Sequence, residues 1–285
     1  MSSLKELFHI LLQNPGKVYD LPEERIIGIL EEGYQFLSEQ QQLIRVDGEF
    51  VVVGDTHGDV FSSASALRRD ISNIIFLGDY VDRGPYQFEN IMLLIVAMLS
   101  RERNIILLRG NHESPLMNRY YGFLNVLKNI FGSKTNQVYD SFLKVFSNMP
   151  YAAVINRSIF LVHGGIANEL RCIDKINRLP KNDIIPTNSI SFQLLWNDPD
   201  ESVKFFAPSP RGEGIFLYGR DAVERFLQEN GLEKIVRAHE YFYPGIKTFF
   251  DEKVITIFSC RYYPIESPKA MLIDENNEIS IMSLL

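Results

Sequence analysis

An acid and an imidazole follow a short apolar run near residue 50. The run Phe-Val-Val-Val at 50–53 ends at Gly-Asp-Thr-His-Gly-Asp, which contains Asp55 and His57. A buried strand that ends in such residues carries them to the edge where α/β sheets bind ligands. Because Asp55 and His57 are two residues apart, an extended backbone can point both side chains toward one ion. Alone, this pair is more typical of turn chemistry than of a metal site.

Four further apolar runs end in the same way, and the repetition changes the interpretation. Each run has the composition of a buried strand, and each is followed by metal-ligand or acid/base residue types. Four of the five histidines in the chain stand at these strand ends, which favours one shared site over separate structural roles. The polar segments are Gly-Asp-Tyr-Val-Asp-Arg-Gly at 78–84, Arg-Gly-Asn-His-Glu at 109–113, His-Gly-Gly at 163–165 and His-Glu at 239–240.

The side chains collected in this way predict a site for two metal ions. Carboxylate, amide and imidazole ligands without a thiolate suit manganese, iron or zinc, and the set is too rich in nitrogen for calcium or magnesium alone. Six ligands exceed what one open catalytic ion needs, whereas they fit two ions that share a bridging carboxylate. Such a pair can activate a water and hold the oxygens of a phosphoryl group. The candidate ligands are Asp55, His57, Asp79, Asn111, His163 and His239.

Two arginines supply the fixed positive charge that a phosphate site requires. Arg83 and Arg211 each stand beside a glycine in a polar segment, and a guanidinium matches phosphate oxygens with bidentate geometry. The alternative is that both arginines form ordinary surface ion pairs. Their position in the motif loops favours phosphate binding.

Seven motifs in order resemble the signature of the phosphoprotein phosphatase family of serine/threonine phosphatases. The match extends from about Leu21 to the C-terminus, and the chain is similar to the catalytic domain of protein phosphatases 1 and 2A in a compact prokaryotic or archaeal form. Any one motif is weak, but seven in order are specific. They are GDTHGD at 54–59, GDYVDRG at 78–84, RGNHE at 109–113, HGG at 163–165, LLWNDP at 194–199, RG at 211–212 and RAHE at 237–240.

The resemblance implies a role for each matching residue. In the family pattern Asp79 bridges the two ions, and the residues matching Asp55 and His57 complete the first. The second ion takes Asn111, His163 and His239.

The remaining roles concern the phosphate and its leaving group. Arg83 and Arg211 match the phosphate-binding arginines, assisted by Asn111, and Tyr263 matches a tyrosine that lies over the cleft. His112 matches the general acid that protonates the serine or threonine oxygen, and Asp82 matches the acid that orients it.

The chain departs from the family pattern at a few positions close to these motifs. Asp59 and Glu240 stand where eukaryotic relatives commonly have glutamine, which adds negative charge. The segment before Tyr263 reads Ser-Cys-Arg-Tyr at 259–262 in place of the usual Ser-Ala-Pro-Asn. We expect metal binding to survive these changes, whereas substrate preference need not.

The order of elements predicts a mixed α/β fold. From 50 to 112 strands alternate with helices near 61–70 and 86–101, which predicts right-handed βαβ units and a parallel sheet. The run 152–162, broken by Asn156-Arg157, predicts a hairpin and thus antiparallel pairing. The resemblance implies a calcineurin-like metallophosphoesterase fold, a central β-sandwich flanked by helices. Further helices are expected within 115–149 and near 190–195 and 221–230, and further strands near 234–238, 246–250, 254–259, 269–273 and 278–283.

The spread of the motifs predicts one catalytic domain over residues 1–285. Residues 1–45 are expected to form a helical segment packed on it, with amphipathic helices over 3–13 and from Pro22 to about 41. Asp47-Gly48 offers a tight turn between 43–44 and the strand at 50.

Composition limits the partners and the compartment. A formal net charge of -7 argues against a nucleic-acid partner but not against a phosphorylated substrate. No run of 18 apolar residues and no signal-peptide pattern is found, so we expect no membrane partner and a cytoplasmic protein. Cys172 and Cys260 are not in a Cys-x-x-Cys spacing and are expected to be free thiols.

These observations predict a metal-dependent serine/threonine protein phosphatase. It would hydrolyse phosphoserine and phosphothreonine monoesters by direct attack of a water or hydroxide that bridges two divalent ions. Manganese is expected, with iron or zinc as alternatives; the substrates are phosphoproteins, and a regulatory subunit is left open. The rival enzyme is a nucleotide or dinucleoside polyphosphate phosphoesterase, and a rival of another class is a non-catalytic phosphoprotein-binding module.

Overall fold

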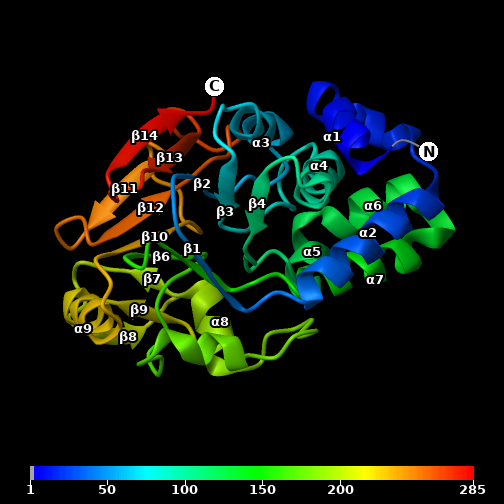
Figure 1. The fold of residues 1–285 in the computed structure, drawn as a ribbon. Helices are drawn as coiled ribbons and strands as arrows, with labels where there is room; N and C mark the ends of the chain where they lie inside the picture. The colour runs from blue at the N-terminus through cyan, green and yellow to red at the C-terminus, as the bar shows by residue number, and fades with distance from the viewer. Residues whose placement is uncertain (1–2) are drawn as a thin grey trace.

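Two β-sheets packed face to face form the centre of the computed structural model, which describes residues 3–285 (Figure 1). The larger sheet has the strand order β1-β5-β6-β10-β12-β11 and mixes parallel with antiparallel pairs. β5 and β6 pair antiparallel, as the predicted hairpin requires. The strands are β1 (Leu43–Val46), β5 (Ala152–Ile155), β6 (Ile159–Val162), β10 (Lys234–Arg237), β11 (Ile246–Phe249) and β12 (Val254–Ile257).

The smaller sheet has the order β14-β13-β2-β3-β4 and contains the first three motif strands. β2, β3 and β4 are parallel, which confirms the predicted βαβ units, and β13 pairs antiparallel with both β2 and β14. The strands are β2 (Phe50–Val53), β3 (Asn73–Phe76), β4 (Asn104–Leu107), β13 (Lys269–Ile273) and β14 (Ile279–Ser283).

The motif strands are buried on both faces, which explains why their sequences are continuously apolar. In β2, Phe50 and Val52 pack in the core between the sheets, whereas Val51 and Val53 pack against helices. This alternation follows from the two-residue period of a strand. A parallel strand covered on both sides has no solvated face, so no polar alternation marks it in the sequence.

Helices cover the outer face of each sheet (Figure 1). Helices α1 to α4, α6 and α7 share a core with the smaller sheet, and α8 and α9 share one with the larger sheet. None of the helices formed by residues 3–285 is both long and apolar enough to span a membrane. They are α1 (Leu4–Gln13), α2 (Glu23–Ser38), α3 (Val60–Leu67), α4 (Gln87–Ser100), α5 (Pro115–Tyr121), α6 (Phe123–Phe131), α7 (Thr135–Phe146), α8 (Ser189–Trp196) and α9 (Arg220–Asn230), with short 3₁₀ turns η1 (Pro15–Asp20), η2 (Gly132–Lys134) and η3 (Ile173–Arg178).

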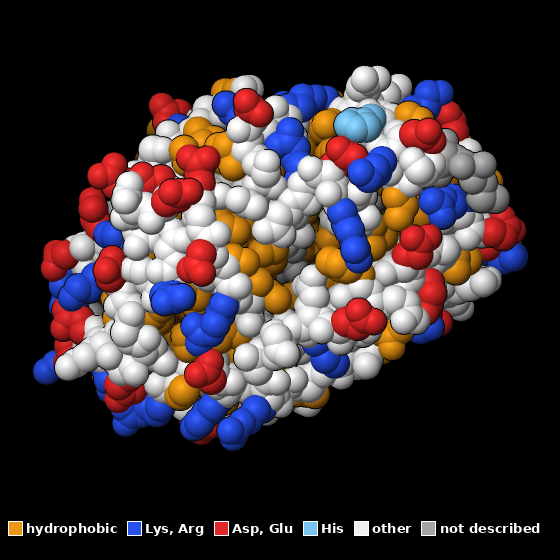
Figure 2. Space-filling model, in the orientation of Figure 1, with side chains coloured by type: hydrophobic (Ala, Val, Ile, Leu, Met, Phe, Trp, Pro, Cys, Tyr) orange, Lys and Arg blue, Asp and Glu red, His pale blue; other side chains and the backbone are white. Residues whose placement is uncertain are grey.

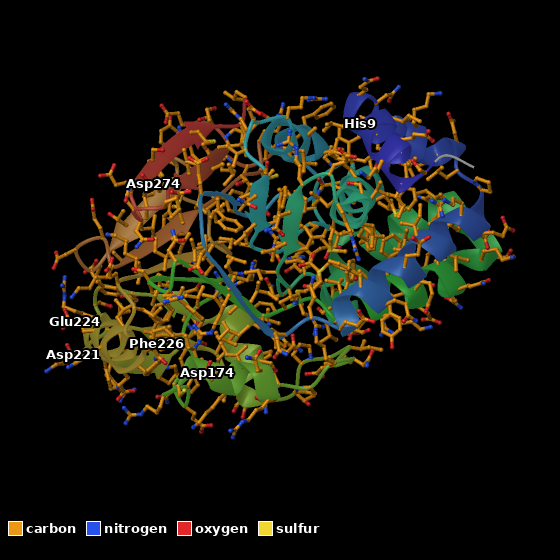
Figure 3. All side chains as sticks on the ribbon, viewed as in Figure 1. His9, Asp174, Asp221, Glu224, Phe226 and Asp274 are labelled. Atoms are coloured by element: carbon orange, nitrogen blue, oxygen red, sulfur yellow. The ribbon has the colours of Figure 1, made fainter. Side chains whose placement is uncertain are left out.

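The surface carries charges of both signs. Figure 2 shows Lys and Arg side chains lying among Asp and Glu side chains, with hydrophobic side chains gathered near the middle of this face. His9, the histidine that follows none of the apolar runs, lies exposed on α1, away from the sheets (Figure 3). It is therefore a natural control for the four histidines at strand ends.

The N-terminal segment differs from its prediction at the end of its second helix and in the pairing of residues 43–46. Residues 1–2 of the predicted segment 1–45 lie outside the described residues, α1 and α2 form as expected, and α2 ends at Ser38 rather than near 41. Residues 43–46 form β1, which pairs parallel with β5 in the larger sheet and does not turn back onto β2. Tertiary pairing with a strand more than 100 residues away overrides the local turn signal at Asp47-Gly48. The single domain over 1–285 stays a prediction.

A second difference is a small third sheet within residues 198–218, where no strand was predicted. Its order is β7-β9-β8, and the strands are β7 (Asp198–Pro199), β8 (Phe206–Pro208) and β9 (Phe216–Tyr218). Strands of two or three residues are too short to show a periodic pattern, so the sequence could not reveal them.

The core between the sheets predicts the cost of one truncation. Ile155 of β5 is fully buried there, so Ile155→Ala should lower the free energy of unfolding by about 2–5 kcal/mol. The matched control is Ile281→Ala in β14, where the side chain is 43% exposed and the loss should stay below about 1 kcal/mol. Urea unfolding of both variants measures the difference, and equal losses would contradict this account of the core.

Candidate metal centre and active site

The five polar segments meet at one place because five strands from both sheets end there. Asp55 follows β2, Asp79 follows β3 and Asn111 follows β4, while His163 and His239 follow β6 and β10 of the other sheet. Asp55 also forms a bridge with Phe258, which directly follows β12. The sandwich thus brings together candidate ligands separated by up to 184 positions, as in the hydrogen bond from the His239 amide to Asp55 Oδ1.

The loops hold their functional side chains with backbone conformations that most residues avoid. Left-handed φ values at non-glycine residues cost free energy and cluster at functional sites. Gly84 is required by a close approach, because a Cβ there would lie 1.9 Å from the His57 carbonyl oxygen. The site residues with left-handed backbones are His57 (φ 40°), Asp79 (57°), Asp82 (68°), Arg83 (71°) and His239 (66°).

Four lone-pair atoms face one another around Asn111. The amide oxygen of Asn111 lies 2.9 Å from His163 Nε2, 3.1 Å from His239 Nδ1 and 3.2 Å from Asp79 Oδ2. Ligands about 2.1 Å from one ion and at right angles to each other lie about 3 Å apart, so these spacings suit a shared cation. An amide nitrogen at the same position would instead donate to these atoms, which is the orientation that suits the site without a cation.

Hydrogen bonds to backbone carbonyls set the tautomers of two histidines. His57 Nδ1 donates to the Val81 carbonyl oxygen at 2.9 Å, and His163 Nδ1 donates to that of Leu77 at 3.0 Å. A carbonyl can only accept, so the proton is on Nδ1 in both rings. Each Nε2 therefore presents a lone pair to the site, which is the arrangement typical of metal-ligating histidines.

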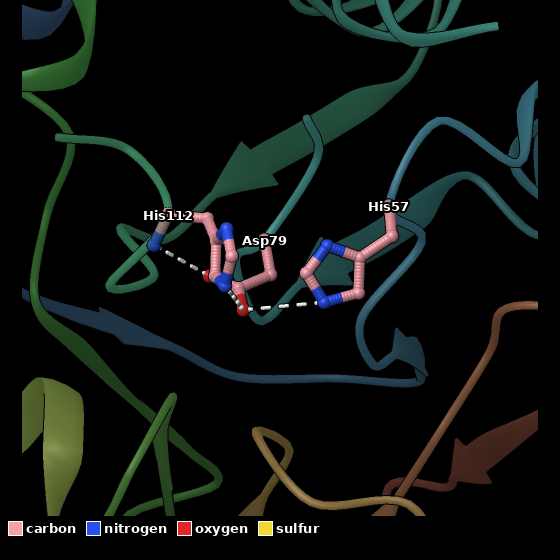
Figure 4. A group of neighbouring side chains, drawn as sticks. All are labelled: His57, Asp79 and His112. Carbon is pink, nitrogen blue, oxygen red and sulfur yellow. Dashed lines mark hydrogen bonds and ion pairs between the residues drawn. The ribbon is translucent and has the colours of Figure 1, made fainter. Parts of the chain in front are cut away.

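Asp79 belongs to both groups of candidate ligands, and Figure 4 shows it between His57 and His112. Asp55 lies beside His57 in the first group. Asp79 Oδ2 lies 3.5 Å from His57 Nε2, and Asp79 Oδ1 lies 3.4 Å from His163 Nε2. Asp55 Oδ2 lies 3.7 Å from His57 Nε2 and has no hydrogen-bond partner among residues 3–285. A buried carboxylate oxygen without a donor is costly unless a cation approaches it.

Burial makes the isolated cluster electrostatically unfavourable. Loss of hydration raises the pKa of Asp55 to about 7, and burial followed by repulsion from Asp55 raises the pKa of Asp79 well above its usual value. Burial also lowers the pKa of His57, His163 and His239 well below the ordinary value, so the imidazoles are neutral. Divalent cations bind where neutral imidazoles lie beside carboxylates whose negative charge is unfavourable when buried.

His112 forms a separate acid–base pair with Asp82. His112 Nδ1 donates to Asp82 Oδ2 at 2.8 Å, and Asp82 also accepts from Asn118 Nδ2 and the Phe123 amide. Burial raises the pKa of Asp82 to about 6. His112 Nε2 lies 3.9 Å from Asp79 Oδ2, so by distance His112 could also be counted among the ligands (Figure 4).

A cavity of about 250 Å³ opens onto the cluster. Arg83 lies on its wall with its guanidinium 4.5 Å from the Tyr121 ring and forms no ion pair with another described residue. Arg211 is held by Asp198, whose Oδ2 accepts from its Nε, and lies 4.0 Å from Glu240. Of the predicted site residues, Asp82 and His163 lie behind the lining, and the others line the cavity: Asp55, His57, Asp79, Arg83, Asn111, His112, Arg211, His239 and Tyr263.

Comparison with known proteins connects this geometry to a family. A model of the calcineurin-like phosphoesterases matches residues 48–243. The serine/threonine-protein phosphatase 4 catalytic subunit of Candida glabrata is 33% identical over 247 residues, which cover 85% of this chain and 79% of that protein. The chain belongs to the phosphoprotein phosphatase family. It is therefore a metal-dependent hydrolase of phosphoesters.

Solved structures agree with the fold of this phosphatase. A serine/threonine phosphatase from Saccharomyces cerevisiae with similarity to human phosphatase PP5 matches with a TM-score of 0.83 at 26% identity, covering 92% of this chain and 90% of that one. A cold-active protein-tyrosine phosphatase from a psychrophilic Shewanella species matches with a TM-score of 0.61 at 18% identity, covering 88% and 84%. The second likeness shows the fold alone. The predicted calcineurin-like sandwich is confirmed.

Two buried charged groups support the phosphatase site, and the motifs had contained them without revealing their roles. Glu113 accepts hydrogen bonds from the amides of Asp79, Tyr80 and Gly110, which ties two ligand loops together. Asp198 holds Arg211 and also accepts from Arg237, which is fully buried. Both acids follow recognisable motif residues, but only the folded chain shows what they contact.

Metal content of variants tests the assignment of ligands in this phosphatase. His163→Ala should bind one divalent ion fewer than the wild-type protein, because His163 Nε2 faces the cluster around Asn111. His112→Ala should keep the wild-type number, since His112 is occupied by Asp82, and His9→Ala is the exposed control. Elemental analysis after equilibration with manganese gives the counts. Loss of an ion in His112→Ala with none lost in His163→Ala would reverse the assignment.

Proposed function

We propose that this phosphatase hydrolyses phosphoserine and phosphothreonine in proteins. The observation that carries the proposal is a single cavity that presents both ligand groups, two arginines and the His112 imidazole to one small volume. The similarity to serine/threonine phosphatases from two yeasts supports this substrate class. A phosphate monoester on a flexible side chain reaches such a cavity from an exposed position on its protein.

The two arginines would bind the phosphoryl oxygens. The Arg83 guanidinium is exposed, stacks on Tyr121 and has no carboxylate partner among the described side chains, so its donors are available to an anion. Arg211 is anchored through Nε by Asp198, which leaves its terminal nitrogens for a ligand. Guanidinium groups held in this way pay little conformational entropy on binding phosphate.

His112 would donate the proton that the leaving oxygen needs. A serine or threonine alkoxide is a poor leaving group, and proton donation by a positioned histidine commonly contributes about 10²–10⁴-fold in rate. Asp82 accepts from Nδ1 and thereby orients the ring with Nε2 toward the cavity. For this step the ring would carry a proton on both nitrogens: Nδ1 keeps its proton toward Asp82, Nε2 gives its proton to the leaving oxygen, and water replaces it.

Two divalent ions would be held by Asp55, His57 and Asp79 and by Asp79, Asn111, His163 and His239. When bound, they would activate a water and stabilise charge on the phosphoryl oxygens. We propose manganese, because the ligands are oxygen and imidazole without thiolate; iron and zinc suit the same set. The unpartnered Asp55 Oδ2 and the lone pairs around Asn111 support this assignment.

The same comparison bears on the partners of this chain. The catalytic-subunit name of the Candida relative suggests that a regulatory subunit selects phosphoprotein substrates for this chain as well. The cytoplasmic location, and the expectation that neither nucleic acid nor membrane is a partner, stay predictions.

Metal removal and restoration test the activity directly. Protein stripped with a chelator should not release phosphate from a phosphoserine or phosphothreonine peptide, and added manganese should restore release, because the ligands alone supply no nucleophile. Phosphate release assayed with manganese, iron and zinc in turn gives the answer. No peptide hydrolysis with any of the three would overturn the proposal, and hydrolysis of a dinucleoside polyphosphate instead would favour the rival enzyme.

Leaving-group dependence tests the role of His112. His112→Asn should lower kcat about 10²–10⁴-fold on a phosphoserine peptide, because the alkoxide must then leave without a proton. The loss on p-nitrophenyl phosphate should be far smaller, since nitrophenolate leaves unprotonated. His9→Asn, on the exposed face of α1, should match the wild-type protein on both substrates. Equal losses on both substrates would exclude His112 as the general acid.

A further inference from the structure

Tyr263 forms part of the wall above the metal centre, and its position depends on a loop. It lies on the segment 258–268 between β12 and β13 and lines the cavity. Its ring stacks on the His57 imidazole, with centroids 5.6 Å apart and planes at 20°. Phe258 and Tyr241 pack against its other sides, at 4.7 and 5.2 Å between ring centroids.

Arg261, two residues before Tyr263, ties this loop to Asp59, two residues after His57. The Arg261 backbone amide donates to Asp59 Oδ2 at 2.8 Å, and its Nε donates to the same oxygen at 3.1 Å. The guanidinium also lies 5.4 Å from the ring of Phe61. One residue thus contributes a backbone bond, a charged side-chain bond and a stacking contact to the same neighbour segment.

Asp59 is a rigid anchor because it is itself fully buried and held. Its Oδ1 accepts from the Ser62 amide at 3.1 Å and caps helix α3, and its Oδ2 accepts from Ser62 Oγ at 2.6 Å. Within residues 3–285, Arg261 is the cation that pairs with Asp59. A buried carboxylate without such a partner is strongly unfavourable, so Arg261 is held at this position.

Few other hydrogen bonds fix the middle of the loop. Ser259 bonds to Gly54 and Asp55 at one end, and the Glu266 amide bonds to the Tyr243 carbonyl at the other. Across residues 260–265, the hydrogen bonds to the rest of the described chain are those of Arg261. The loop that carries Tyr263 therefore has one central attachment.

The two partners occupy positions where the sequence departs from the family pattern. Asp59 stands in place of a common glutamine, and Arg261 lies in the segment that replaces Ser-Ala-Pro-Asn. The structure shows that the two departures contact each other. Because the buried Asp59 carboxylate pairs with the partly buried Arg261 guanidinium, we treat the two positions as one structural unit.

We propose that Asp59 and Arg261 are positioning residues that hold Tyr263 against His57 and so shape the phosphate-binding wall of the active site. Neither residue is among those that line the cavity. Their effect reaches the substrate through the loop 260–265 and the Tyr263 ring, which faces the cavity beside His57. The inference rests on the proposed function for the substrate, but phosphate binding tests it without turnover.

The test is a double-mutant cycle on the affinity of manganese-loaded protein for inorganic phosphate. Arg261→Ala should weaken the calorimetric Kd about tenfold, and Tyr263→Ala should weaken it by a similar factor. The double variant should be no weaker than Tyr263→Ala alone, because the pair acts through the ring. Manganese content should equal that of the wild-type protein in all three variants.

Two further variants separate positioning from general destabilisation. Asp59→Asn keeps an acceptor for Ser62 and Arg261 while removing the charge pair, and it should change Kd in the same direction even if Arg261→Ala is too unstable to purify. Arg45→Ala breaks an exposed ion pair with Asp174 of 2.7 Å and should leave Kd unchanged.

Three results would overturn the inference: additive effects of Arg261→Ala and Tyr263→Ala, an unchanged Kd in Asp59→Asn, or no phosphate binding by the wild-type protein. With a phosphopeptide, KM should rise more than kcat falls in Arg261→Ala. Wild-type protein that binds phosphate but does not hydrolyse phosphopeptides would contradict the proposed function and leave this cycle fully informative.

Discussion

The close approach of buried carboxylate, amide and imidazole ligands is the interaction on which the rest of the site depends. Asp79 faces His57 with one oxygen and His163 with the other, and the atoms around Asn111 lie about as far apart as ligands of one ion. Without a cation these lone pairs repel, and burial makes the charge of Asp55 and Asp79 costly. A divalent ion removes both penalties, which is why the same arrangement serves binding and catalysis.

The β-sandwich sets this geometry because it joins strand ends from two sheets. Each sheet supplies ligands, and the close-packed residues between the sheets, such as Val52 and Val236, fix the spacing of the strand ends, because separating the sheets would open cavities. Left-handed backbones and the bonds of Glu113 then aim the side chains. The flanking helices cover the sheets. Helix α3 is also linked to the His57 loop, because Asp59 of that loop caps its N-terminus.

Much of the fold and of the candidate site was predictable from the sequence alone, and the features that were not predicted have physical causes. The apolar runs, the βαβ order and the hairpin were visible because burial imposes a pattern on consecutive residues. The parallel pairing of β1 with β5 and the short strands β7 to β9 were not visible, because such pairing depends on distant partners. The supports given by Asp198 to Arg211 and by Arg261 to Asp59 were missed for the same reason.

By itself, the sequence determined which residue types stand at the strand ends, and with them the family and its class of chemistry. Local signals suffice for this because strand ends, glycines and ligands lie within a few residues of each other. Only the tertiary structure decided which lone pairs face one another, which of Arg83 and Arg211 pairs with a carboxylate, and that Arg261 binds Asp59. Those outcomes depend on distances between residues far apart in the chain, and packing alone sets these distances.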